Sequence, residues 1–168
     1  MIAKTRFIAA CLCVLAGVAA CTSPGPTASP ASPAPVQASP NPALVEFETH
    51  MRESIKSQGS LVRDLAAATT GSTEQLGLVA RQLTDWAATE QRWLDEHPAD
   101  ACYEDAWLTY QSGVEDVGTA AAAFAALAAR PSPASDAEGQ AAAVSLATGT
   151  SSLDAAADLA NQARAACR

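Results

Sequence analysis

Histidine and carboxylate side chains offer the first candidate chemistry in this chain. There are two histidines, His50 and His97, and Glu46, His50 and Glu53 share one face of a predicted helix. Imidazole and carboxylate groups can ligate a metal, so a metal site is one interpretation. The helix register places His97 some 8 Å along the axis from the level that faces His50, too far for both rings to bind one ion. We therefore favour a solvated helix face and predict no metal or cofactor.

Two carboxylate pairs, Glu104-Asp105 and Glu115-Asp116, recur three helical turns apart, or about 11 residues. Paired carboxylates can act as general acid and base or bind a cation. A solvated face is the simpler interpretation, because the neighbouring positions are polar and imply no pocket. The sequence contains no CxxCH haem attachment, glycine-rich phosphate loop, GxSxG elbow or Ser/His/Asp set. We therefore predict that the protein is not an enzyme.

Cys102 and Cys167 are a candidate redox or structural pair. If two helices fold back on each other around residues 131–135, Cys102 faces about residue 164, which puts Cys167 less than about 5 Å away along the axis. A catalytic redox pair usually has CxxC spacing, which is absent here. We predict a structural disulfide that closes a loop of about 64 residues and contributes roughly 4 kcal/mol in the chain-entropy model. Two free thiols are the alternative.

Three aromatic residues should gather close to Cys102. A turn near residues 98–99 brings Trp93 to the level of residues 104–105, beside Tyr103 and Trp107. One interpretation is a core cluster at one end of the domain. The other is an aromatic patch that binds an apolar ligand or a partner protein.

The amino-terminal segment has the three parts of a secretory signal. Lys4 and Arg6 precede an apolar run from Phe7 to Ala20, and small residues end that run. The run is too short to cross a bilayer of about 30 Å as a stable helix. Cys11 and Cys13 lie inside the signal and should be removed with it.

The residues Val18, Ala19, Ala20 and Cys21 resemble the lipobox of bacterial lipoproteins. That resemblance covers residues 1–21 only. It implies that residues 1–20 are a lipoprotein signal peptide and that the Cys21 thiol is diacylated after cleavage. Two acyl chains anchor a protein firmly where one gives marginal binding. We therefore expect a lipid-anchored, extracytoplasmic protein of the cell membrane; an ordinary secretory signal that leaves Cys21 as a free thiol is the alternative.

Residues 21–41 form the acylated cysteine and a Pro, Ser and Ala-rich tether. Such a segment favours extended polyproline II, so twenty residues could reach roughly 60 Å. The tether is either a spacer that lifts the domain off the membrane or a linker of unimportant length. Without the signal, the chain keeps 8 basic and 18 acidic residues, a net charge of −10. Acidic surfaces repel phosphate backbones, so nucleic acid is not an expected partner.

The candidate residues depend on four helices predicted within a single domain, residues 42–168. Apolar residues recur at the 3–4 spacing of one helix face, and strand-like alternation is absent. The expected helices are 42–68, a second from the Ser72 cap to Glu96, a third from about Asp100 to Arg130, and a fourth from about Ser135, whose stripe ends at Cys167. Short turns between long helices predict an all-α, antiparallel up-down-up-down four-helix bundle.

The stripe of the second helix comprises Leu76, Val79, Leu83, Trp86, Glu90, Trp93 and Leu94. The fourth helix is mostly alanine, and small residues bury little area each. We therefore expect the fourth helix to be the weakest on its own.

Together these features predict a membrane-anchored cell-envelope lipoprotein whose helical domain is a non-catalytic interaction or structural module. The expected partners are the membrane, through the lipid anchor, and an envelope protein. The alternative is an extracytoplasmic carrier of a small apolar ligand, which would use the bundle interior or the aromatic end. A metal-binding protein or an enzyme comes third.

Overall fold

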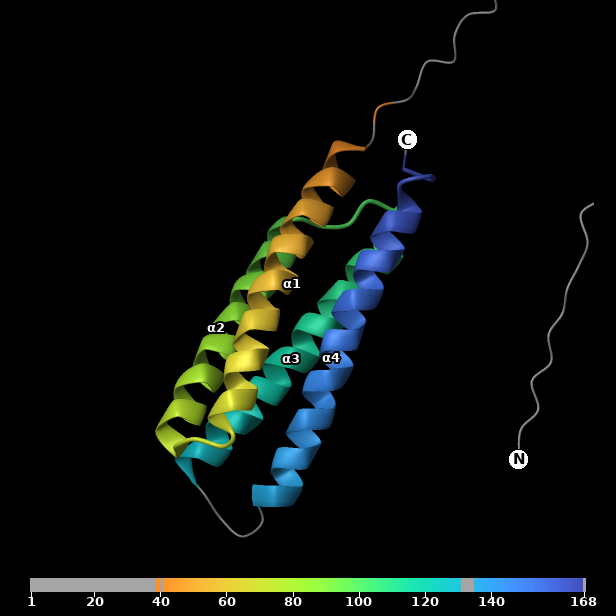
Figure 1. Cartoon of the computed structure of the whole chain (residues 1–168). Helices are drawn as coiled ribbons and strands as arrows, with labels where there is room; N and C mark the ends of the chain where they lie inside the picture. The colour runs from red at the N-terminus through yellow and green to blue at the C-terminus, as the bar shows by residue number, and fades with distance from the viewer. Residues whose placement is uncertain (1–38, 40, 131–134, 168) are drawn as a thin grey trace, which may run out of the picture. The chain divides into compact units, whose positions relative to one another are not determined.

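The computed structural model describes residues 39, 41–130 and 135–167. These residues form four helices and no strand: α1 (Pro42–Ala68), α2 (Thr73–Glu96), α3 (Glu104–Ala129) and α4 (Ser135–Ala163) (Figure 1). The all-helical class is confirmed, and the four helices share one core, which is consistent with a four-helix bundle. The predicted signal peptide, Cys21, the tether up to residue 38 and the turn at 131–134 lie outside the described residues.

The first two helices begin where their capping residues predict. Pro42 occupies the first turn of α1, and the side chain of Asn41 accepts a hydrogen bond from the backbone N–H of Ala43 at 2.9 Å. Ser72 and Gln75 form the expected capping box at the start of α2. Helix α1 passes through Gly59 without interruption, so the penalty of this glycine is outweighed by packing on either side.

The third helix begins later than predicted, at Glu104 rather than near Asp100. Asp100 instead organises a turn: its backbone carbonyl accepts from Tyr103 N–H at 3.0 Å, and its carboxylate accepts from Cys102 N–H at 3.5 Å. This competition between an Asp side chain and the helix explains the later start. Helix α4 ends at Ala163, and a turn separates it from Cys167. Both cysteines therefore lie just outside helices.

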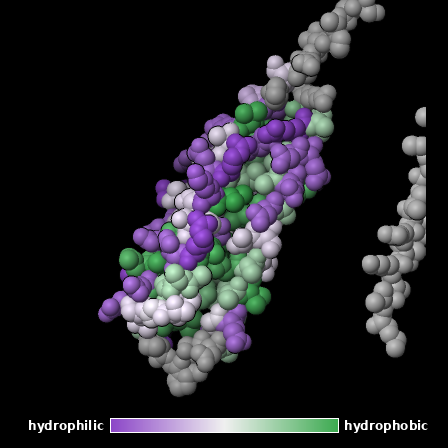
Figure 2. Space-filling model, viewed as in Figure 1, coloured by the Kyte–Doolittle hydropathy of each residue, from purple (hydrophilic) through white to green (hydrophobic). Residues whose placement is uncertain are grey.

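The predicted stripes form the core. On α4, the stripe residues from Ala142 to Ala160 are buried, including Leu153. Those of α3 are buried from Tyr103 to Phe124. The largest side chains that solvent hardly reaches come from all four helices: Leu44, Phe47, Leu65, Leu83, Leu94, Tyr110 and Leu153. In Figure 2, hydrophilic residues cover most of the upper half of the visible face, whereas apolar and pale residues are commoner toward the lower end.

Helices α3 and α4 approach closely where glycines face each other. A methyl group added to Gly149 would lie 2.8 Å from Cγ2 of Val117 and 2.9 Å from the backbone oxygen of Gly113. One added to Gly113 would lie 2.9 Å from Cδ2 of Leu153. These distances are shorter than van der Waals contact, so this small-residue seam requires glycine at both positions.

Candidate functional site in the polar seam of helix α1

A buried carboxylate connects three helices. Glu90 of α2 is only 5% exposed, and its Oε2 atom lies 2.7 Å from Nε2 of His50 on α1. The same oxygen accepts a hydrogen bond of 2.7 Å from the hydroxyl of Tyr110 on α3. A buried carboxylate is costly unless donors surround it, and here one imidazole and one phenol supply them. The stripe position of Glu90 is thereby explained.

The phenol of Tyr110 is held in its neutral form. Burial raises the pKa of Tyr110 far above its ordinary value, and the negative charge of Glu90 raises it further. The phenol is therefore neutral at physiological pH and donates its hydrogen bond to the carboxylate of Glu90.

The hydroxyl of Ser54, which lies near Glu90, also makes a hydrogen bond within the protein. Ser54 of α1 accepts a hydrogen bond of 3.1 Å from the indole N–H of Trp86 on α2, and both residues are buried. The imidazole of His50 contacts Glu90 and not this serine. Within the described part of the chain, no serine hydroxyl or thiol is hydrogen bonded to an imidazole, which is one arrangement that activates a nucleophile.

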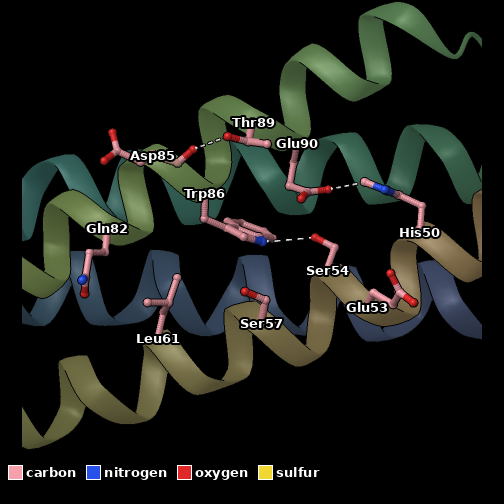
Figure 3. A pocket seen from close by; sticks show the side chains of 10 residues that line it. All are labelled: His50, Glu53, Ser54, Ser57, Leu61, Gln82, Asp85, Trp86, Thr89 and Glu90. Atoms are coloured by element: carbon pink, nitrogen blue, oxygen red, sulfur yellow. Dashed lines mark hydrogen bonds and ion pairs between the residues drawn. The ribbon is translucent and has the colours of Figure 1, made fainter.

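An open groove of about 570 Å³ runs along the surface between α1 and α2, above these bonds. Figure 3 shows Trp86 of α2 pointing across it to Ser54 of α1, and Glu90 of α2 pointing to His50, with Ser57 and Leu61 also on the α1 side. Most of the lining side chains are polar, and none of them is a lysine or arginine. The groove is therefore an acidic, partly aromatic surface between two helices.

The two histidines stack on the same indole, that of Trp93. The imidazole of His50 stacks on the indole with centroids 3.8 Å apart and planes at 3°. That of His97 stacks at 4.3 Å and 8°. Two parallel rings this close to one indole are too wide to share a face, so they cover opposite faces. No group of three His, Cys, Asp or Glu side chains in the described ranges is placed to hold a metal ion.

Two of the three predicted aromatic residues, Trp93 and Tyr103, meet through Phe47, a residue that the sequence analysis did not single out. Phe47 stacks on Trp93 at 6.3 Å and on Tyr103 at 5.5 Å, and Tyr103 is buried. Trp107 is partly buried, and its indole N–H donates to the backbone oxygen of His97 at 2.9 Å. These contacts favour the core interpretation over an open patch, because the ring faces of Trp93 are already occupied.

Cys102 and Cys167 form a disulfide in the structure, with Cα atoms 5.5 Å apart. Asn41, the cap of α1, lies against this pair. Its backbone N–H donates to the carbonyl oxygen of Cys167 at 3.3 Å, and its side-chain amide donates to Sγ of Cys102 at 3.7 Å. The start of α1 is thus attached to the disulfide.

Two polar contacts between α1 and the α4 side were not predicted. The buried carboxylate of Glu48 accepts two hydrogen bonds, of 2.6 and 2.5 Å, from Arg164. This bond raises the pKa of Arg164. The buried amide of Gln58 donates to Thr150 at 3.1 Å. Both α1 residues continue the 3–4 spacing of its apolar stripe, which is the signal that could have identified them.

Comparison of the chain with protein-family models, with curated proteins and with solved structures finds no match. Within the described residues, none of the helices has both the length and the apolar character needed to cross a membrane. The site is therefore interpreted from its own geometry.

Proposed function

We propose that this protein is a cell-envelope lipoprotein, anchored to the membrane through acylated Cys21, and that its helical domain is a non-catalytic interaction module. The lipobox-like residues before Cys21 support the anchor. Hydrogen-bonded polar side chains at the α1–α2 seam support the assignment to a binding rather than a catalytic class. A carrier of a small apolar ligand is less well supported, because the groove at this seam is open and three acidic side chains, Glu53, Asp85 and Glu90, line it.

The contact between Asn41 and the disulfide carries the proposal on orientation. Residue 41 is the last residue of the predicted tether, and its backbone N–H donates to the carbonyl oxygen of Cys167. The tether therefore enters the domain at the end held by Cys102 and Cys167. We infer that this end faces the membrane, and that the end with the 69–72 turn faces outward, toward a partner in the envelope.

The same proposal includes alternating helix directions, as in an up-down-up-down bundle. Gly77 on α2 lies beside Ala128 on α3, and further along the chain Ala87 lies beside Gly118; methyl groups added to these glycines would come within 3.2 and 3.1 Å of the alanine Cβ atoms. Residue numbers that rise on one helix and fall on the other support antiparallel neighbours. The order is also reversed between α1 and α2, in the pairs His50 with Glu90 and Ser54 with Trp86.

Anchoring can be tested by cell fractionation and intact-mass measurement of the full chain in a bacterial host that processes lipoproteins. We expect the wild-type protein in the membrane fraction, with a mature chain that starts at Cys21 and carries diacylglyceryl. The Cys21→Ser variant should lose the lipid and that cleavage. Cys13→Ser, which removes a cysteine from the signal itself, is the matched control and should behave as wild type. A lipid-free wild-type chain cleaved elsewhere would overturn the proposal.

A further inference from the structure

The buried carboxylate in the α1–α2 seam keeps one oxygen available. Both donors to Glu90, His50 and Tyr110, bind Oε2, and no hydrogen bond from the described residues reaches Oε1. Among those residues, every fully enclosed side-chain oxygen or nitrogen has a partner. Oε1 of Glu90 must therefore retain contact with solvent, and Glu90 lines the groove. The unbonded oxygen is accordingly open to the groove.

Two further carboxylates near this oxygen favour a cationic ligand, and His50, which contacts the other oxygen of Glu90, is the one basic side chain among the lining residues. Glu53 and Asp85 line the same groove as Glu90, and no lysine or arginine lies among the lining residues. The carboxylate is nearly enclosed, so its field is screened less than that of a surface carboxylate. An ammonium group supplies the N–H donors that Oε1 lacks and also compensates the charge.

The rest of the groove can accommodate an apolar stem. Trp86 presents part of its indole to the groove, and Leu61 lies on the opposite wall (Figure 3). The indole is fixed by its hydrogen bond to Ser54, so its orientation is set before a ligand arrives. An aromatic face beside a carboxylate suits an alkylammonium, because the ring attracts both the charge and the methylene groups.

We propose that the groove between α1 and α2 binds a primary ammonium group on a short apolar stem, with Oε1 of Glu90 as its acceptor and Trp86 against its stem. Glu53, at the rim, adds to the attraction. This inference specifies a ligand class for the proposed interaction module and rests on that proposal. Failure of the proposed lipid anchor can be distinguished from failure of this inference, because ligand binding is measured on purified protein and does not depend on how Cys21 is processed.

The test is an NMR titration of the full-length protein in detergent with n-butylammonium chloride, followed at the indole N–H signal of Trp86. That signal is assigned by its loss in Trp86→Phe. Sodium chloride at equal ionic strength, n-butanol and tetramethylammonium are the comparison probes. We expect saturable shifts with butylammonium, and much weaker effects from an uncharged stem or from a cation without N–H donors.

Two variants locate the binding. Glu90→Gln should weaken butylammonium binding about tenfold or more, because it removes a charged acceptor. Glu53→Gln, which changes an exposed side chain and leaves the core intact, should weaken it by a smaller factor. Glu115→Gln on the exposed face of α3 is the matched control and should bind as wild type. If sodium chloride reproduces the shifts, or if Glu53→Gln and Glu90→Gln both bind as wild type, the proposal is wrong.

Discussion

Helix α3 meets α4 at a seam where Gly113 and Gly149 face each other, whereas α1 packs through an apolar stripe that also carries buried, hydrogen-bonded polar side chains. At the small-residue seam, Gly113 and Gly149 leave no space for a methyl group. In the polar seam, Glu48, Gln58 and Glu90 are buried, and each has a hydrogen-bonding partner on another segment. The two seams therefore depend on different forces within one domain.

This difference affects how well each seam tolerates substitutions and which seam can take part in binding. Two closely packed helices gain many small dispersion contacts. An added side-chain atom forces the helices apart, so many of these contacts are lost together. A buried hydrogen bond contributes only about 1 kcal/mol net, yet leaving one partner unsatisfied costs more. The candidate binding groove borders the polar seam, because Glu90 belongs to that seam and also lines the groove.

The largest expected effect on stability comes from the disulfide that joins the end of α4 to the α2–α3 loop. Cys102→Ala with Cys167→Ala should lower the free energy of unfolding by about 4 kcal/mol, because the bond restricts an unfolded loop spanning a sequence separation of 65 residues. Urea unfolding of oxidised wild type and of the double variant measures the difference. Mass spectrometry of the non-reduced mature protein is the control. Two free thiols in that sample would remove the basis of the prediction.

A pair of glycine substitutions tests the small-residue seam. Gly149→Ala should cost about 2–3 kcal/mol, since its methyl group would overlap Val117 and the Gly113 backbone. Gly59→Ala on α1 should instead stabilise by up to about 1 kcal/mol, because its methyl group would meet only Arg63, at 3.9 Å. Thermal unfolding of both variants provides the comparison. Equal effects at the two positions would contradict the contrast between the seams.

A smaller effect, with a pH signature, is expected in the polar seam. Tyr110→Phe removes one donor to Glu90 and should cost roughly 1–1.5 kcal/mol at neutral pH. In wild type the folded pKa of Tyr110 is raised above the ordinary 10.0, so its contribution is present below pH 10.0 and is lost as pH rises beyond it. The loss should approach about 1.4 kcal/mol per pH unit.

Urea unfolding at several pH values between neutrality and pH 11 measures this slope. The variant lacks the phenol, so its stability should decline less steeply than that of wild type at the alkaline end. Parallel declines in the two proteins would show that the phenol is not held neutral by the fold.

The smallest effect is expected when both members of a polar pair are replaced together. Gln58→Leu with Thr150→Val removes donor and acceptor at once and should change stability by less than about 1 kcal/mol. Gln58→Leu alone should cost more than the double variant, because it leaves the Thr150 hydroxyl without this partner. A double-mutant cycle measures the coupling. Strict additivity would mean that the hydrogen bond contributes nothing to the polar seam.

Much of the fold could be predicted from the sequence because its signals are local. Apolar spacing predicted all four helices, and Ser72 with Gln75 predicted the start of α2. The cysteine pairing followed from helix register. The later start of α3 was missed because Asp100 stabilises a turn through its own side chain, and a periodic pattern does not register that competition.

The site could be predicted only in part, because its contacts join residues distant in sequence. Glu90 was placed on the stripe of the second helix, but its partners His50 and Tyr110 come from two other helices. The aromatic residues were placed near one another, whereas the stacking of both imidazoles on Trp93 depends on side-chain rotation. The low stability expected of α4 was based on the small area that each alanine buries. That reasoning does not include the close approach of α3 and α4 that glycine permits.

Native-state hydrogen exchange, followed residue by residue, tests the contrast between the seams most directly. Because polar side chains share the buried stripe of α1, whereas α3 and α4 pack closely through glycines, the core amides of α1 should open at a lower free energy than those of α3 and α4. The contrast should persist in oxidised protein, in which the disulfide is intact. Core amides of α1 that exchange only with global unfolding, together with an α4 that opens first, would contradict the account.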